Sequence, residues 1–204
     1  RAGERRRARQ RQLERGDAAG AGAAEGEAPT VRGRDGGDDR GPVPAARAVY
    51  LLQQVLLAAL MAAVTWVGRF FMGSETGVSW LWPAAGIGLS ALTILGLRAW
   101  PALFIGSLIG RAAISPGDLP WLLASVDTIE AVVGALLLRS WPGFRPDLSR
   151  LGDAFGLLLA TILTASLGAL GGALAVLASG TPPWPSIGRG LATWMVGDGM
   201  GALL

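Results

Sequence analysis

The feature that most constrains the fold is a long apolar run without charge. Ala48–Gly68 (AVYLLQQVLLAALMAAVTWVG) contains 21 residues and no ionisable side chain except one tyrosine. A helix rises about 1.5 Å per residue, and the hydrocarbon core of a bilayer is about 30 Å thick, so this run is long enough to cross it. As a surface helix in water it would lack a polar face. The run therefore predicts a transmembrane helix.

More apolar stretches follow the first one, and 51% of all residues are hydrophobic. The predicted spans cover residues 78–97, 100–116, 119–138 and 154–178, and a sixth begins near Ile187 and still continues at Leu204. The expected fold is all-α: a polytopic transmembrane helical bundle of about six spans. Because the chain starts at Arg1 and stops inside an apolar run, we expect a fragment truncated at its C-terminal end.

The segment before the first span has a different composition. Of the 33 charged residues, 19 precede Ala48, and large aliphatic side chains are scarce there. Such a segment buries too little apolar area to offset its ordering entropy. Residues 1–45 are therefore predicted to be a disordered, Arg-rich cytoplasmic tail, and residues 46–204 an integral-membrane domain. The Arg cluster could contact anionic lipid, but the lack of aromatic stacking residues argues against nucleic acid as a partner.

The dipeptide Trp-Pro occurs twice between predicted spans, at Trp82-Pro83 and Trp100-Pro101. Proline is tolerated in the first turn of a helix, where its missing N–H has no intrahelical partner. Tryptophan is enriched where hydrocarbon meets lipid headgroups. These four residues are therefore predicted to mark helix starts and to anchor them at the membrane interface.

Arginines in the short connections predict the orientation. With a cytoplasmic N-terminus, the inner side would hold Arg98, Arg139, Arg145 and Arg150, and the outer side only Arg69 and Arg189. This bias follows the positive-inside rule. We expect a multi-pass protein of a bacterial inner (plasma) membrane. The inner loop at residues 139–156 is predicted to form a short amphipathic helix on the membrane surface.

Four ionisable residues fall within predicted spans: Arg111, Asp127, Glu130 and Asp198. Each costs about 2.5 to 3.5 kcal/mol near the bilayer centre on insertion scales, so each needs a partner or a function. Glu130 lies nine residues from both Trp121 and Arg139, and Arg111 and Asp198 fall at a similar depth in their spans. Asp127 and Glu130 are i, i+3 neighbours on one helix face. The four residues are predicted to form one ligand-binding or signal-sensing cluster.

Three interpretations of this cluster stay open: a buried ion-pair network that only fixes packing, a polar pocket for a small ligand or ion, and a proton or ion path. With three carboxylates against one guanidinium, a cation or a proton is the favoured occupant. The chain has no Cys and no His, which excludes thiolate sites and Ser-His-Asp catalysis. We expect no cofactor, no metal and no enzyme activity in this fragment. Small residues in the fifth span (SLGALGGALA) and at Gly197–Gly201 are predicted to be packing faces.

Three stretches, in this order, resemble one known family. They are WLWPAAGIGLSALTILGLRAWPALFIGSLIG, VDTIEAVVGALLLRS and ATWMVGDGMGALL. Their Trp-Pro, Gly-x-Arg-x-Trp-Pro, Thr-x-Glu-Ala and Gly-Asp-x-x-Gly patterns are similar to those of the membrane-associated sensor domain of the first MASE type, a bacterial integral-membrane module. Asp127 stands where that family usually has Asn, and Val126 replaces a Gly.

The resemblance implies a sensory input domain ahead of a C-terminal cytoplasmic effector, such as a histidine kinase, a diguanylate cyclase or a phosphatase. The partners it implies are the lipid bilayer, an unidentified small ligand or ion, that effector, and a second copy in a homodimer. The alternative is a six-helix transport protein or the substrate-binding subunit of an uptake transporter. The sequence after Leu204 would discriminate between them, because a kinase or cyclase module supports sensing and a repeated set of spans supports transport.

Overall fold

A computed structural model describes residues 44–74, 77–114, 119–180 and 187–204. These residues form helices and connecting turns and contain no β-strand, apart from one isolated bridge between Met72 and Ser79. The elements are α2 (Pro44–Gly68), the 3₁₀ turn η1 (Arg69–Phe71), α3 (Pro83–Leu95), the 3₁₀ turn η2 (Leu97–Ala99), α4 (Trp100–Ile114), α5 (Pro120–Ser140), α6 (Leu151–Ala178) and α7 (Ile187–Leu203). The all-α prediction is confirmed. The predicted tail lies outside the described residues, except for Pro44 and Ala45 at the start of α2.

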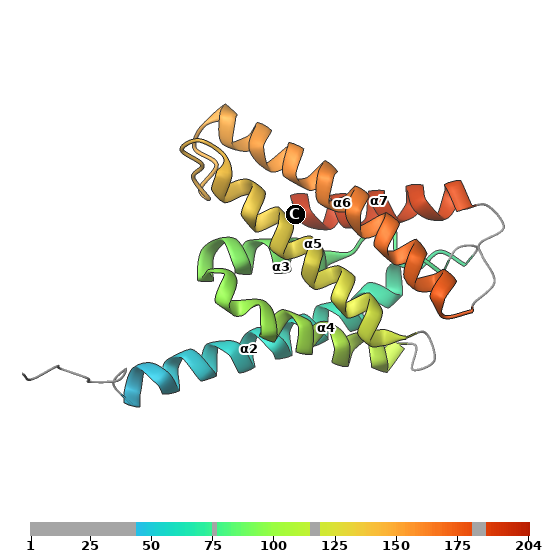
Figure 1. Cartoon of the computed structure of the whole chain (residues 1–204), viewed down its shortest axis with the longest axis horizontal. Helices are drawn as coiled ribbons and strands as arrows, with labels where there is room; N and C mark the ends of the chain where they lie inside the picture. Colours follow the sequence, from blue (N-terminus) through green and yellow to red (C-terminus); the bar gives the residue numbers. More distant parts are fainter. Residues whose placement is uncertain (1–43, 75–76, 115–118, 181–186) are drawn as a thin grey trace, which may run out of the picture. The chain divides into compact units, whose positions relative to one another are not determined.

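Successive helices run in alternating directions, and α5 lies in the middle of the bundle (Figure 1). It packs against α3, α4 and α6, while α2 packs on α4 and α7 packs on α6 and α3. The apolar core between α2, α3, α4 and α5 includes Met61, Leu92 and Leu103. A polar residue on the buried faces of α5 is therefore surrounded by protein on several sides.

Four helical segments are long and apolar enough to cross a bilayer: Ala45–Phe71, Leu97–Ile114, Pro120–Ser140 and Leu151–Ala178. The other two helices are shorter, with 13 residues in α3 and 17 in α7. At about 1.5 Å per residue, α3 alone is roughly 20 Å long, less than the hydrocarbon thickness. The chain is thus a multi-pass membrane protein with four helices of spanning length in the described part.

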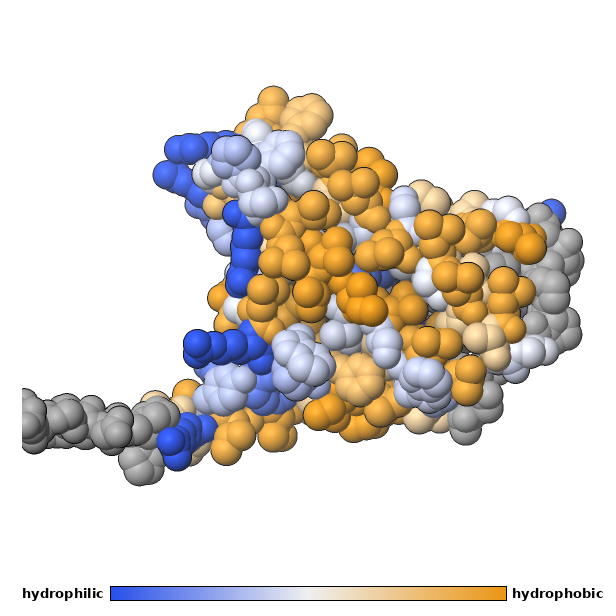
Figure 2. All heavy atoms as spheres, in the orientation of Figure 1, coloured by the Kyte–Doolittle hydropathy of each residue, from blue (hydrophilic) through white to orange (hydrophobic). Residues whose placement is uncertain are grey.

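The surface of the bundle is apolar and its interior is built from small residues. Large side chains such as Ile94, Val55 and Leu174 are exposed to 64–70%, and apolar side chains dominate the face seen in Figure 2. A soluble monomer does not expose such area, whereas lipid tails cover it without penalty. Inside, Ala, Gly, Ser and Thr prevail, which lets the helix backbones approach closely.

The predicted span 78–97 is helical only from Pro83 onward, so its predicted start was wrong. Residues 78–82 are non-helical and lie against α7, where the Trp82 N–H donates a hydrogen bond to the Gly197 carbonyl at 3.0 Å. A Cβ on Gly197 would lie 2.2 Å from the Ser79 carbonyl oxygen, and one on Gly201 would lie 1.9 Å from that of Trp82. Non-helical backbone is tolerated at membrane depth when it is buried in protein. The predicted Gly197–Gly201 packing face makes this contact.

The connection between α5 and α6 contains no helix, which overturns the predicted amphipathic helix at residues 139–156. Residues 141–150 form turns, with positive φ at Gly143 and Leu148. Pro142 and Pro146 lack the N–H groups that a helix would need. The Asp147 carboxylate accepts a hydrogen bond from the Ser149 N–H, which closes a local turn in place of a helix.

One end of the bundle is more polar than the rest. The first turn of α2, the α3–α4 turn and the α5–α6 connection lie at the same end (Figure 1), and hydrophilic side chains gather there (Figure 2). The arginines of these connections therefore share one side of the domain.

Candidate functional site

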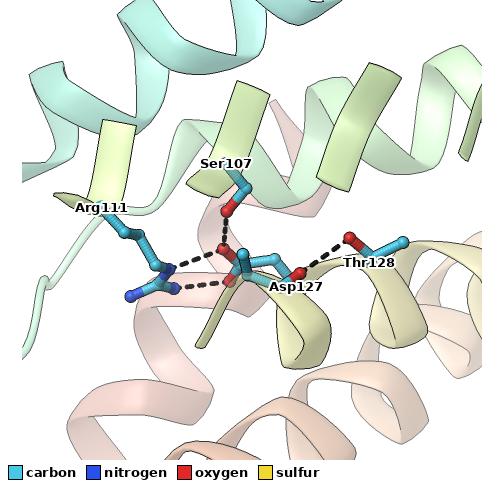
Figure 3. Close-up of polar contacts among 5 residues, drawn as sticks. Ser107, Arg111, Asp127 and Thr128 are labelled. Atoms are coloured by element: carbon cyan, nitrogen blue, oxygen red, sulfur yellow. Dashed lines mark hydrogen bonds and ion pairs between the residues drawn. The ribbon is translucent and has the colours of Figure 1, made fainter. Parts of the chain in front are cut away.

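An Arg–Asp ion pair joins α4 to α5 inside the bundle. Arg111 Nε donates to Asp127 Oδ2 at 2.7 Å, and Arg111 Nη2 donates to Asp127 Oδ1 at 2.5 Å. The Ser107 hydroxyl donates a third hydrogen bond to Asp127 Oδ2. Figure 3 shows Ser107 and Arg111 directed from α4 toward the same carboxylate. Both charged side chains are only about 10% exposed, at 11% for Arg111 and 10% for Asp127.

The position of this pair follows from the two faces of α4. Ser107 and Arg111 are i, i+4 neighbours and point toward α5. On the opposite face, Gly106 and Gly110 form a second i, i+4 pair, and a Cβ on Gly106 would lie 2.4 Å from the Ala58 carbonyl oxygen of α2. Because the glycines let α2 and α4 touch along their backbones, α4 is held firmly while its polar face supports the ion pair.

Trp82 lies over the guanidinium of this pair. The Arg111 Cζ atom is 4.6 Å from the centre of the indole ring, a cation–π contact. Trp82 is 5% exposed, so it faces the protein interior, and its predicted role as an interface anchor was wrong. Its neighbour Pro83 begins α3, as a helix-start residue should. Trp100 begins α4 with Pro101 next to it and is 50% exposed, and its anchoring role stays a prediction.

The other two predicted residues, Glu130 of α5 and Asp198 of α7, meet beside α6. A Cβ on Gly168 would lie 2.6 Å from Glu130 Oε2 and 2.6 Å from Asp198 Oδ2. The two oxygens are therefore at most twice that distance apart, and the carboxyl groups are within hydrogen-bonding reach of each other. Both side chains are buried. The Trp194 indole, one turn before Asp198, also hydrogen-bonds its carboxyl group.

The structure thus brings the four predicted residues into one cluster, but in two unlike pairs. Arg111 interacts electrostatically with Asp127, with Glu130 and with Asp198. Only Asp127 forms hydrogen bonds with it. The acidic pair has no cation in direct contact among the described residues.

Four residues of the site were missed by the sequence reasoning: Ser107, Trp82, Gly168 and Trp194. The i, i+4 spacing of Ser107 and Arg111 was a usable signal, and so was the small-residue face around Gly168. The contact between Trp82 and Arg111 had no signal, because it depends on the non-helical segment before α3.

Several buried polar atoms near the cluster have no hydrogen-bond partner within the described residues. They are Thr65 Oγ1, Trp82 Nε1 and Asp198 Oδ2. Thr65 packs against Gly110, next to Arg111. Buried polar groups are nearly always paired, so unpaired ones indicate water, a proton or a ligand. The arrangement can hold a small polar species or change its protonation.

Comparison with known proteins gives one family. The sequence model of the MASE1 family matches residues 51–204, which includes all four charged residues of the site. No curated protein and no solved structure matches the chain. The match covers most of the chain and agrees with its apolar helices. The chain belongs to the MASE1 family of membrane-associated sensory domains.

Proposed function

We propose that this domain is the signal input of a bacterial signal-transduction protein and that its charged cluster is the sensing site. In this proposal Arg111, Asp127, Glu130 and Asp198 receive a small ligand or ion, and their occupancy controls a C-terminal cytoplasmic output module such as a histidine kinase or a diguanylate cyclase. The sensory class comes from the family; the site and the output are the proposed part.

The observation that carries the proposal is a set of three buried acids and one arginine drawn from three helices. Such residues are costly inside a bilayer and usually mark function. Since α4, α5 and α7 each contribute a charge, a change of charge at the cluster alters how these helices pack. A signal shifts the domain between two packings only if it binds one of them better. The location of the cluster between helices meets this requirement.

For the topology, we propose six membrane passes with the N-terminus in the cytoplasm of a bacterial cell and the domain in its inner membrane. In support, successive helices alternate in direction and the polar connections share one end. The short α3 would complete its pass with the non-helical residues 78–82. Reporter fusions at Arg98 and Arg145 should report cytoplasm, and one at Arg69 should report the outside. A periplasmic signal at Arg98 or Arg145 would overturn the orientation.

The test of the sensing site is Glu130→Gln in the full-length protein, with output activity measured in membranes. We expect insertion to be unchanged and output to be fixed at one level, because the amide cannot change charge. Asp147→Asn is the matched control, since it makes the same chemical change at an exposed turn outside the cluster. Equal output of Glu130→Gln and wild type under every condition would leave the cluster with a packing role only.

A further inference from the structure

The acidic pair differs from the rest of the cluster in lacking a counter-charge. The Arg111 guanidinium is engaged by both oxygens of Asp127 and covered by Trp82. Glu130 and Asp198 therefore face each other with no cation in contact in the described part of the chain. Asp198 is 3% exposed, and its Oδ2 atom, which lies on the Gly168 side, has no hydrogen-bond donor among the described residues.

Two ionised carboxylates cannot hydrogen-bond, because each is only an acceptor. Two carboxyl groups that touch in a buried place are stable when one carries a proton and donates it to the other. We propose that Glu130 and Asp198 share one proton, and that this proton is the species to which the domain responds. The inference rests on the proposed function and names the ligand class of that site.

The packing at Gly168 favours a proton over a larger cation. The space beside the two oxygens is already too small for a methyl group, since a Cβ there would lie 2.6 Å from each of them. A metal ion needs about four to six ligands at 2.0–2.5 Å. In the described residues no group of three or more acidic side chains is arranged around such a position. A proton needs only the two oxygens that are present.

The groups around the pair define how its charge acts. From α5 it is faced by Asp127, from α4 by Arg111, and from α7 by Trp194; α6 contributes Gly168, which has no side chain. With Arg111 neutralised by Asp127, loss of the shared proton leaves two adjacent anions at the contact of α5, α6 and α7. Their repulsion should separate α5 from α7, so the closely packed form belongs to low pH and the separated form to high pH.

The experiment measures the α5–α7 distance as a function of pH in the full-length protein in lipid nanodiscs. These 204 residues contain no cysteine, so spin labels on Ile129→Cys and Val196→Cys report one distance, once any cysteine elsewhere is replaced by serine. Both positions are exposed on the bundle surface and neighbour the acidic pair. We expect the distance distribution to shift to longer values as pH rises, and to stay short at all pH values with Glu130→Gln and Asp198→Asn combined.

A second measurement uses the protein without labels or substitutions in the pair. Infrared difference spectra between high and low pH should show the carbonyl band of one protonated carboxyl group, and this band should be lost in Glu130→Gln and in Asp198→Asn. A pH-independent distance together with no such band overturns the proposal. So does a distance that responds to Na⁺ at constant pH and not to protons, because the occupant is then a metal cation.

The outcomes separate this inference from the proposed function. If the pair does not titrate but Glu130→Gln still fixes the output, the shared proton is wrong and the sensing site stands. If the distance changes with pH while the output follows neither pH nor the Glu130→Gln substitution, the shared proton stands and the sensing function fails.

Discussion

The two charged pairs of the site lie next to each other and differ in how completely their polar atoms are satisfied. Asp127 accepts two hydrogen bonds from Arg111 and one from Ser107, and the guanidinium also has an aromatic ring over it. Glu130 and Asp198 offer each other two like charges, and one carboxyl oxygen of Asp198 has no donor among the described residues. A fully paired group gains nothing from a new partner, whereas an unpaired one does.

This difference assigns separate roles to residues that the sequence presents as one cluster. The Arg111–Asp127 pair fixes α4 against α5, since breaking it would leave a buried charge alone. The acidic pair is where a small change in charge alters the balance between packings. The following predictions test that division.

The largest expected effect is a contrast between two carboxamide substitutions. Asp127→Asn should reduce the free energy of unfolding by about 3 to 5 kcal/mol, because it leaves Arg111 buried without its counter-charge. Asp198→Asn should cost less than about 1 kcal/mol, because the amide can donate to Glu130 in place of a proton. Denaturant unfolding in mixed micelles measures both. Equal costs for the two substitutions would remove the distinction between the pairs.

Gly168→Ala should have an intermediate effect. The new methyl group would lie 2.6 Å from the oxygens of Glu130 and Asp198, so α6 must move away from the pair. Such overpacking costs about 1 to 3 kcal/mol. Gly152→Ala is the matched control in the same helix, because a Cβ there meets no atom within 4 Å. If both alanines behave alike in the unfolding experiment, α6 does not press on the acidic pair.

Ser107→Ala should have the smallest effect of the three. It removes one of three hydrogen bonds to Asp127 and leaves the bidentate contact with Arg111 in place. Hydrogen bonds between membrane helices contribute about 0.6 kcal/mol on average, so a loss of about 0.5 to 1.5 kcal/mol is expected. The same micelle unfolding assay applies. A loss as large as that of Asp127→Asn would mean that Ser107, rather than Arg111, holds the carboxylate.

Much of the fold could be predicted because lipid imposes simple rules on length and charge. The run at Ala48–Gly68 gave a helix, and the prolines at Pro83 and Pro120 stand where helices begin. The start of α3 was misplaced because residues 78–82 are as apolar as a helix and only their contact with α7 keeps them extended. The missing helix at residues 141–150 was a failure to give Pro142 and Pro146 enough weight.

The site was predictable as a set of residues and not as an arrangement. Counting positions from the flanking tryptophans placed Arg111, Glu130 and Asp198 at a common depth, and the structure brings them together. Which acid pairs with the arginine depends on helix rotation, which differs by about 100° between successive residues and is not encoded in depth. The role of Gly168 is likewise invisible in a sequence where most small residues serve packing.

The contact between residues 79–82 and α7 has a mechanical consequence. It joins two main chains through a hydrogen bond and two glycine approaches, so no side chain can rotate to absorb a displacement. Any shift of α7 at Asp198 must drag Trp82 with it and change how the indole sits on Arg111. The acidic pair and the ion pair are therefore two ends of one stiff linkage, through which an event at the first reaches the α4–α5 contact.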